Sequence, residues 1–496
     1  MLGRITILFA RTSDFGGDSM SVDSNASLQP LFYPKTIAVI GASPDGDAFR
    51  WGGKTFIEGL VKQNFRGKVF PVHPKAETVL GFKVYKSVSD IPDEVDLAIF
   101  SVPASAVLQV MADCVKKRVK FAHIFTAGFS ETGLEDRAQL EKDLVTLASE
   151  GGVRVVGPNC MGVYCPDAGV AWVKDFPAET GPVGFVSQSG QLAGHFIEES
   201  KARGIRFSKV ISYGNASDLQ CHEFLRYLAA DEQTAIVGSY IEGLKDGRAF
   251  FDIARELTLK KPFVVWKGGH TEGGSRAVSS HTASIAGSHH LWRALCKQTG
   301  IISVSSIEEL VSTIVALQDL PQPQGPNVAI VGGAGGGSVT MTDAAERAGL
   351  KVPHLSEATI KGLSEFVPVH GQSVKNPLDI FSVLINPEHF MSMIELLRDD
   401  PRIDALLYYQ RVEWALNRAK GFLDVILQMT LDGARALKKP LFLVLADATT
   451  LEGEILRRQA RERYNSAGMA SFPTFDAAAR AVYNLSEYQR YLSSRS

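Results

Sequence analysis

The chain has 496 residues, more than a single hydrophobic core ordinarily serves, so we expect about three domains. Apolar residues make up 45% and charged residues 21%, which is usual for a soluble globular protein. The net charge of −2 gives no electrostatic basis for binding nucleic acid or an anionic membrane, and no apolar run reaches the length that spans a bilayer. The five cysteines form no CxxC pair, which predicts free thiols in a reducing compartment, the cytoplasm.

The N-terminal residues 1–30 predict a disordered tail. The first ten, MLGRITILFA, contain a short apolar patch, but no small-residue cleavage site follows it, so we do not expect a signal peptide. Residues 11–30 are rich in Ser, Asp, Gly and Asn, a composition that buries little apolar surface. Met20 is a second candidate for the start of translation.

One theme recurs along the rest of the chain: a β-branched strand, a glycine turn, then a helix. It occurs at residues 35–44, 182–190 and 327–338, with further short apolar strands and helix-length amphipathic stretches between these points. Continuous apolar strands that alternate with helices predict parallel sheets covered on both faces. We therefore expect three doubly wound α/β domains at 31–162, 165–318 and 326–496. The proline-rich segment DLPQPQGPN predicts the linker before the last of them.

In the first domain, the turn Gly41–Pro44 follows a strand, where doubly wound sheets bind their ligands. An NAD site requires an acidic residue at the end of the next strand, to bind the ribose hydroxyls. That strand ends instead in PVHPK, with His73 and Lys75. A cation there fits a phosphorylated ribose, so NADP or coenzyme A is favoured over NAD. The small loops SVPAS and TAGFSE, which end the following strands, leave room for an extended ligand.

In the second domain, the segment Ser187–Gly190 (SQSG) lies between an apolar strand and an amphipathic helix. The backbone N–H groups at such a helix start are unpaired, and small residues let an anion approach them, which predicts a phosphate site. The alternative is a serine that only caps the helix.

His281 lies in SRAVSSHTASIAGS, a run of small residues that is unlike a core or zinc environment. A neutral imidazole is a good nucleophile toward phosphorus, and Glu242, at the end of a neighbouring strand, is the candidate to orient it. A metal-binding, core or surface role for His281 stays open on these residues alone. We expect no metal site, because no acidic or cysteine cluster accompanies it.

Eleven motifs in one order carry a resemblance to a known family: IAVIGAS, FPVHPK, DLAIFSVPAS, TAGFSETG, VVGPNCMGV, GFVSQSG, SYGNASD, YIEGLKDGR, KPFVVWKGG, SHTASIAG and KNPLD. The sequence resembles the α subunit of nucleoside-diphosphate-forming acyl-CoA synthetases, such as ADP-forming acetyl-CoA synthetase. More distantly it is similar to the α subunit of succinyl-CoA synthetase. The resemblance implies a Rossmann-like CoA-binding domain followed by two flavodoxin-like domains, and it covers nearly the whole chain.

The resemblance also implies roles for individual residues. The CoA-binding set is Gly41, Ala42, Ser43, Pro44, Lys75, Ser101, Val102, Pro103, Thr126, Ala127 and Gly128. The phosphate and acyl set is Ser187, Gln188, Ser189, Gly190, Asn159 and Cys160. His281 matches the family's phosphohistidine, and Glu242 matches the acid that holds it. The implied reaction passes from acyl-CoA and phosphate through an acyl phosphate and phosphohistidine to ATP.

Two departures from the family pattern affect these expectations. No ATP-grasp segment is evident, so we expect an ATP-grasp β subunit as partner, carrying ADP/ATP and Mg²⁺, in an assembly such as α2β2. The loop VGGAGGGS replaces a Thr-Asn-Ala-Gly-Gly run, so the third domain is expected to serve subunit contacts; a second nucleotide site there is not favoured. The alternatives are a non-catalytic CoA-binding regulatory protein and, less consistent with His281, an NADP-dependent reductase.

Overall fold

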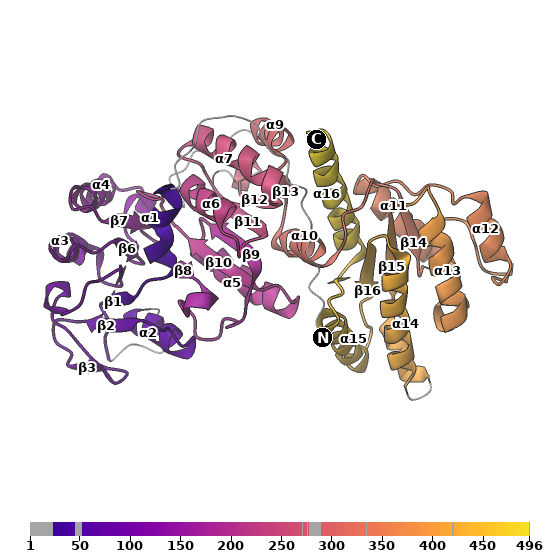
Figure 1. The fold of residues 1–496 in the computed structure, drawn as a ribbon, viewed down its shortest axis with the longest axis horizontal. Helices are drawn as coiled ribbons and strands as arrows, with labels where there is room; N and C mark the ends of the chain where they lie inside the picture. Colours follow the sequence, from indigo (N-terminus) through magenta and orange to yellow (C-terminus); the bar gives the residue numbers. More distant parts are fainter. Residues whose placement is uncertain are drawn as a thin grey trace.

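The computed structural model of the protein describes residues 23–44, 52–269, 271–274, 276, 289–333, 335–368, 370–418 and 421–495, with side chains from residue 28 onward. Three mainly parallel sheets follow one another along the chain and along the long axis of the molecule (Figure 1). The prediction of doubly wound α/β domains is thereby confirmed.

The first sheet has the order β2-β1-β5-β6-β7, and all its neighbours are parallel. Its strands are β1 (Thr36–Ile40), β2 (Lys68–Val72), β5 (Leu97–Phe100), β6 (Phe121–Ile124) and β7 (Arg154–Val156). A small hairpin, β3 (Thr78–Val79) and β4 (Phe82–Lys83), follows β2. The helices of this domain are α2 (Gly53–Lys62), α3 (Val107–Lys117) and α4 (Glu135–Glu150).

The second sheet has the order β13-β12-β11-β9-β10-β8, in which β8 alone is antiparallel. Its strands are β8 (Gly162–Tyr164), β9 (Thr180–Ser187), β10 (Phe207–Ser212), β11 (Ile236–Ile241), β12 (Phe263–Lys267) and β13 (Ile302–Val304). Its helices are α5 (Gly190–Ala202), α6 (Cys221–Ala230), α7 (Gly247–Lys260), α9 (His289–Thr299) and α10 (Ile307–Asp319). Gly162, expected at the end of the first domain, thus belongs to the second sheet.

The third sheet has the order β14-β15-β16-β17. Its strands are β14 (Val328–Val331), β15 (Ala405–Gln410), β16 (Leu441–Leu445) and β17 (Ser471–Phe472). Its helices are α11 (Gly336–Arg347), α12 (Glu357–Ser364), α13 (Pro387–Asp399), α14 (Phe422–Leu437), α15 (Leu451–Ser466) and α16 (Phe475–Ser493). Isolated parallel bridges join β14 to Lys351 and Leu378 on the side away from β15, so β14 lies inside the sheet.

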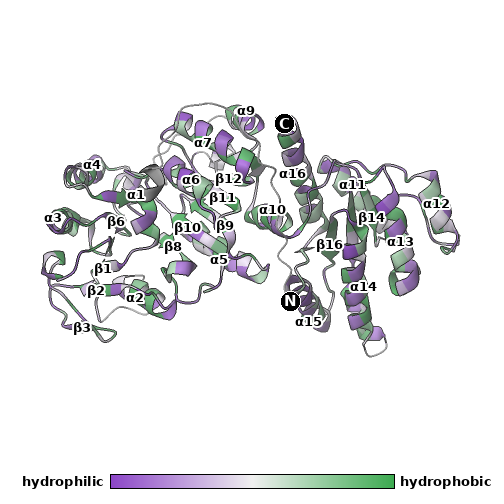
Figure 2. Ribbon diagram, in the orientation of Figure 1, coloured by the Kyte–Doolittle hydropathy of each residue, from purple (hydrophilic) through white to green (hydrophobic). Residues whose placement is uncertain are grey.

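The strands are buried on both faces, as a parallel sheet between helix layers requires. All residues of β5, β6, β14 and β16 are buried, and Figure 2 shows hydrophobic strands in all three sheets beneath helices of mixed polarity. The largest apolar core cluster contains residues from all three domains. Helix α16 of the third domain contacts α10 of the second, where Asn484 Nδ2 donates to Thr313 Oγ1 at 3.0 Å.

The expected disordered tail is wrong for residues 23–30, because helix α1 spans Asp23–Phe32. Leu28, Leu31 and Phe32 are buried, and the Phe32 ring stacks on Tyr227 of α6 with 4.4 Å between centroids. Sequence composition misses this helix because its apolar residues are few and find their partners on a distant part of the chain. Residues 1–22, with Met20, lie outside the described residues.

Candidate functional site

Three loops of the first domain meet where the strand order of its sheet reverses. Strand β1 lies between β2 and β5, so the chain leaves β1 in one direction along the sheet and returns to add β5 on its other side; doubly wound sheets bind their ligands at this point. The amide of Ser101 donates to the carbonyl of Ile40 at 2.9 Å, and Thr126 Oγ1 donates to the carbonyl of Val102 at 2.6 Å. The segments predicted for CoA are thus brought together: Gly41–Pro44, Ser101–Pro103 and Thr126–Gly128.

Gly41 makes the close approach between two of these loops. Its φ is +86°, and a Cβ there would lie 2.1 Å from the carbonyl oxygen of Ser101. No other residue fits this turn without moving backbone. Ala42 is fully buried, whereas Ser43 is half-buried and Pro44 is exposed.

His73 and Lys75 follow strand β2 and differ in their surroundings. His73 Nδ1 accepts hydrogen bonds from the backbone amides of Lys75 (3.3 Å) and Ala76 (3.1 Å). His73 thereby shapes the turn that follows β2. The Lys75 side chain is exposed at this end of the sheet.

The segment Ser187–Gly190 begins helix α5 at the carboxyl end of β9. Ser189 is the N-cap, and its hydroxyl accepts from the amide of Leu192 at 3.3 Å. The Ser187 hydroxyl is fully buried and donates to the carbonyl of Ser189 at 2.7 Å. The capping alternative is therefore present in the structure, where the Ser189 hydroxyl bonds one of the backbone amides at this helix start.

Gln188 connects this turn to Glu242. Its side-chain oxygen accepts from the backbone amides of Glu242 (2.8 Å) and Gly243 (3.0 Å), and the backbone amide of Gln188 donates to the carbonyl of Tyr240 at 3.0 Å. Strand β9 lies between β11 and β10, so this connection spans the reversal point of the second sheet.

Glu242 is 7% exposed, and its Oε2 has no hydrogen-bond partner among the described residues. Lys267 donates to the main-chain carbonyl of Glu242 at 2.7 Å, not to its carboxylate. Burial lowers the pKa of Lys267, and the charge of Glu242 opposes that shift. This buried carboxylate oxygen is therefore available to accept a further hydrogen bond.

The loop 157–160 joins the two sites. The amide of Asn159 donates to the carbonyl of Thr126 at 3.0 Å, and the carbonyl of Pro158 accepts from the amide of Asn215 at 3.0 Å. Asn159 has a φ of +57°, a conformation that asparagine tolerates better than most residues. Cys160, in contrast, points into the core. Its thiol lies near the carbonyl oxygens of Ile124 and Val156, and burial raises its pKa to about 12.

A polar network that the sequence reasoning did not select connects the first two domains. Asn215 Nδ2 donates to Glu131 Oε2 (2.7 Å) and Glu141 Oε2 (2.9 Å). Ser217 donates to Glu141 Oε1. Asn215 lies in SYGNASD and Glu131 in TAGFSETG, two of the motifs that carry the family resemblance. Glu141 lies within an amphipathic helix and outside every such motif, so the sequence did not predict its contact with Asn215.

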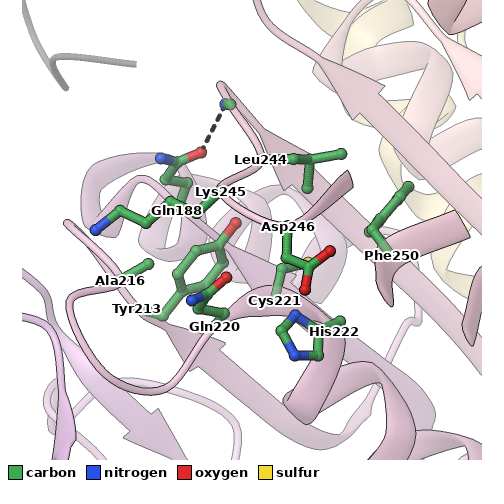
Figure 3. A pocket seen from close by; sticks show the side chains of 11 residues that line it. Gln188, Tyr213, Ala216, Gln220, Cys221, His222, Leu244, Lys245, Asp246 and Phe250 are labelled. Carbon is green, nitrogen blue, oxygen red and sulfur yellow. Dashed lines mark hydrogen bonds between the residues drawn. The ribbon is translucent and has the colours of Figure 1, made fainter. Parts of the chain in front are cut away.

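A small cavity of about 20 Å³ adjoins this network (Figure 3). Gln188, Tyr213 and Lys245 line it, with His222 and Asp246 beside them. Burial lowers the pKa of Lys245, and Glu141 opposes that shift. The buried Tyr213 hydroxyl has no partner among the described residues. This volume holds about one water molecule, so the cavity beside Gln188 is too small for a substrate.

His281 lies outside the residues that the structure describes, so the predicted pairing of His281 with Glu242 stays a prediction. Within the described part of the chain, no group of three or more His, Cys, Asp or Glu side chains is placed to hold a metal ion. No helix in that part is long and apolar enough to cross a membrane.

Three family models match successive parts of the chain. They are a CoA binding domain at residues 35–166, a succinyl-CoA ligase-like flavodoxin domain at 180–317 and a Ligase-CoA domain at 328–479. They cover the three sheets in order, except that β8 of the second sheet falls within the first match. These matches confirm the expected fold, a CoA-binding domain followed by ligase domains.

Relatives of known name extend the comparison. The chain is 41% identical over 380 residues to the α subunit of acetate–CoA ligase [ADP-forming] II of Pyrococcus furiosus, covering 77% of this chain and 81% of that protein. It is 40% identical to acetate–CoA ligase [ADP-forming] I of Archaeoglobus fulgidus, of which it spans 54%.

A solved structure agrees over most of the chain. It is the dinucleotide-forming acetyl-coenzyme A synthetase 1 of Ca. Korarchaeum cryptofilum in complex with phosphate and ADP, with a TM-score of 0.80 and 32% identity, covering 94% of this chain and 98% of that one. With all three domains matched in order, the chain belongs to the family of ADP-forming acyl-CoA synthetase α subunits.

Proposed function

We propose that this chain interconverts acyl-CoA, ADP and phosphate with a carboxylic acid, ATP and CoA, through an acyl phosphate and a phosphorylated His281. The observation that carries the proposal is the connection between the two sites. The hydrogen bond from Asn159 to Thr126 joins the CoA-type loops to the loop 157–160, and Met161, next along the chain, packs against Gly190 of the phosphate-type turn. A thioester held at the first site and a phosphate held at the second would therefore lie next to each other, as acyl transfer between them requires.

In the first step, a phosphate oxygen attacks the thioester carbonyl, the C–S bond breaks, and CoA leaves as the thiol after taking a proton. The amides at the start of α5 would hold the phosphate, and the loops at Gly41, Ser101 and Thr126 would hold CoA. Cys160 takes no part as a nucleophile, because its thiol is buried and protonated.

In the second step, a ring nitrogen of His281 attacks phosphorus and the carboxylate leaves. The free Oε2 of Glu242 would accept from the other ring nitrogen, which orients the ring and offsets its developing charge. The phosphoryl group then passes from His281 to the terminal phosphate of ADP.

An ATP-grasp partner chain is proposed for that last transfer. The relative from Pyrococcus furiosus is named as a subunit, and the Archaeoglobus fulgidus relative is nearly twice as long as the part this chain matches. The partner would hold ADP with Mg²⁺, which neutralises charge on the transferring phosphoryl group.

The test uses the purified chain with radiolabelled phosphate and a panel of acetyl-, branched, aryl and dicarboxylic acyl-CoAs. Acid-labile phosphate that maps to His281 is the expected result, and the acyl-CoA that gives it identifies the substrate class. If the chain binds CoA but His281 stays unmodified, both alone and with an ATP-grasp partner and ATP, the chain is a non-catalytic CoA-binding protein and the proposal is wrong.

A further inference from the structure

The backbone at Glu242 is bonded from both sides by side chains of the neighbouring strands. Strand β11 lies between β9 and β12 in the second sheet, and Glu242 follows the last residue of β11. Gln188 follows the last residue of β9, and Lys267 is the last residue of β12. All three residues are only 7% exposed, so the polar groups that meet here have little access to water.

Gln188 bonds the backbone donors on the side of β9. Its side-chain oxygen accepts from the N–H groups of Glu242 at 2.8 Å and Gly243 at 3.0 Å (Figure 3). An amide oxygen has two lone pairs, so these two bonds use its full capacity as an acceptor. The side chain thus serves the turn after β11, and only its NH₂ group remains for any other contact.

Lys267 bonds the backbone acceptors on the side of β12. Its Nζ donates to the carbonyl of Glu242 at 2.7 Å and to the carbonyl of Gly268 at 2.6 Å. Both partners are main-chain carbonyls, although a buried ammonium is costly unless a carboxylate pairs with it. The reaction steps proposed above give this buried cation no task.

The two side chains together fix the peptide groups on either side of the Glu242 Cα atom. The carboxylate has no comparable anchor, because its Oε2 has no hydrogen-bond partner among the described residues. The position of the carboxylate therefore depends on how the backbone is held. Supporting hydrogen bonds of this kind keep a functional group in its productive geometry.

We infer that Gln188 and Lys267 are positioning residues for the phosphoryl transfer and act through Glu242. They hold its backbone so that the free Oε2 stays in one place for a ring N–H of His281. This inference rests on the proposed function, because it needs Glu242 to orient His281. It assigns Gln188 to the acid instead of to the phosphate, and it gives Lys267 a role that the family resemblance did not imply.

The first test measures phosphorylation of His281 in single turnovers with acetyl-CoA at a series of inorganic phosphate concentrations. Gln188→Met and Lys267→Met keep the length of each side chain and remove its hydrogen bonds. Each is expected to lower the maximal rate by about 10²-fold, the usual cost of a misplaced reacting group. The phosphate concentration that gives half the maximal rate should stay unchanged, since binding of phosphate is not affected.

The controls for this test are Gln298→Met and Lys297→Met, which lie on the exposed surface of α9 and should keep the original rate. An unchanged maximal rate in Gln188→Met and Lys267→Met overturns the inference. So does a rise in the half-maximal phosphate concentration in Gln188→Met at an unchanged maximal rate, because that result makes Gln188 a phosphate ligand.

The second test combines each variant with Glu242→Gln. Because the two residues act through the Glu242 carboxylate, each should slow the Glu242→Gln chain by less than about twofold, far from additive with its effect in the unmodified chain. A purely structural role moves the rate equally in both chains. Equal slowing with and without the carboxylate therefore overturns the inference.

The third test needs no activity. Hydrogen exchange, followed by mass spectrometry on a peptide that contains Glu242 and Gly243, reports on the two backbone N–H groups that Gln188 bonds. Gln188→Met should speed their exchange at least about tenfold, whereas Gln298→Met should leave it unchanged. Unchanged exchange in Gln188→Met overturns the inference even where the kinetic variants fold poorly.

These tests distinguish failure of the inference from failure of the proposed function. An unmodified chain that never phosphorylates His281, alone or with an ATP-grasp partner and ATP, overturns the proposed function and this role with it. An unmodified chain that phosphorylates His281, with Gln188→Met and Lys267→Met equally fast, overturns only the role of these two residues.

Discussion

The backbone amide of Asn159 donates a 3.0 Å hydrogen bond to the carbonyl oxygen of Thr126. Asn159 precedes the second sheet and Thr126 follows strand β6 of the first, so this bond holds the loop before the second sheet against the carboxyl end of the first sheet. Asn215 continues the connection, since its side chain reaches Glu131 and Glu141 of the first domain. The proposed acyl transfer depends on this placement, and the following predictions test its parts.

His281→Ala is expected to abolish phosphate incorporation from acyl-CoA and phosphate, because no other group replaces a covalent nucleophile. Affinity for CoA should stay as in the unmodified chain, since the CoA-type loops lie in the first domain. Radiolabel incorporation and CoA titration measure the two effects. His290→Ala, nine residues on, is the matched control and should keep full incorporation; a His281→Ala chain that still gains acid-labile phosphate contradicts the mechanism.

Glu242→Gln is expected to slow phosphorylation of His281 by about 10²–10⁴-fold, the usual contribution of an orienting acid–base group. The amide keeps the shape of the side chain and the hydrogen bonds that Gln188 makes to the backbone there. Single-turnover kinetics with the best acyl-CoA measure the change. Glu256→Gln, on an exposed face of α7, should keep the original rate, and equal rates for both variants would remove Glu242 from the mechanism.

Gly41→Ala is expected to weaken CoA binding at least about tenfold and to destabilise the fold by more than about 1 kcal/mol. The cause is steric, since the new Cβ would lie 2.1 Å from the carbonyl oxygen of Ser101 at a φ of +86°. Gly194→Ala in α5 is the control: a Cβ there meets nothing within 4 Å, and alanine should stabilise the helix by about 0.5–1 kcal/mol. Thermal unfolding and CoA titration of both variants measure these effects. Equal losses of stability and of CoA affinity in the two variants would contradict the steric cause at Gly41.

Cys160→Ala should retain phosphorylation of His281 in the folded protein. The thiol is buried and its pKa is raised to about 12, so it is neither nucleophilic nor accessible at neutral pH. Iodoacetamide at pH 7 should likewise leave Cys160 unmodified in the native chain, as peptide mapping can show. Two results would contradict this prediction and indicate that Cys160 reacts. One is rapid alkylation of Cys160, and the other is loss of phosphorylation in a Cys160→Ala chain that unfolds like the native one.

Protonation of Glu309 in acid should lower the free energy of unfolding of the second and third domains. Burial by itself raises the pKa of Glu309, but hydrogen bonds from Ser305, with Arg480 and Asn484, outweigh it and hold the pKa below its ordinary 4.5. As the pH falls, the unfolded chain takes up the proton first. The stabilisation is therefore complete above about pH 4.5 and is lost as the pH drops through the lower pKa of the folded state.

The variant Glu309→Gln should flatten this acid dependence and cost about 1.5–3 kcal/mol at neutral pH, because hydrogen bonds to a charged group are lost. Denaturant unfolding at a series of pH values measures both effects. Glu308→Gln, the exposed neighbour, is the control and should leave the pH profile as it was. An unchanged profile in Glu309→Gln would mean that other carboxylates govern the acid transition.

The sequence by itself determined the class of fold and the chemical groups of the site. A strand, a glycine turn and a helix recur three times with buried β-branched strands, and local periodicity is enough to predict parallel sheets from this. The loops at Gly41, Ser101, Thr126 and Ser187 were identified because each follows a strand, and ligand-binding loops of such sheets follow strands.

The tertiary structure alone decided which of these groups meet and what each side chain does. Three features depend on partners distant in sequence: the bond from Asn159 to Thr126, the burial of Cys160 and the docking of the helix at Asp23–Phe32. The bonds of Gln188 and Lys267 to the backbone of Glu242 have the same origin, since they form only where β9 and β12 lie on either side of β11. Local propensity acts over a few residues, whereas a partner and a pKa are set by whatever the folded chain places within a few ångströms.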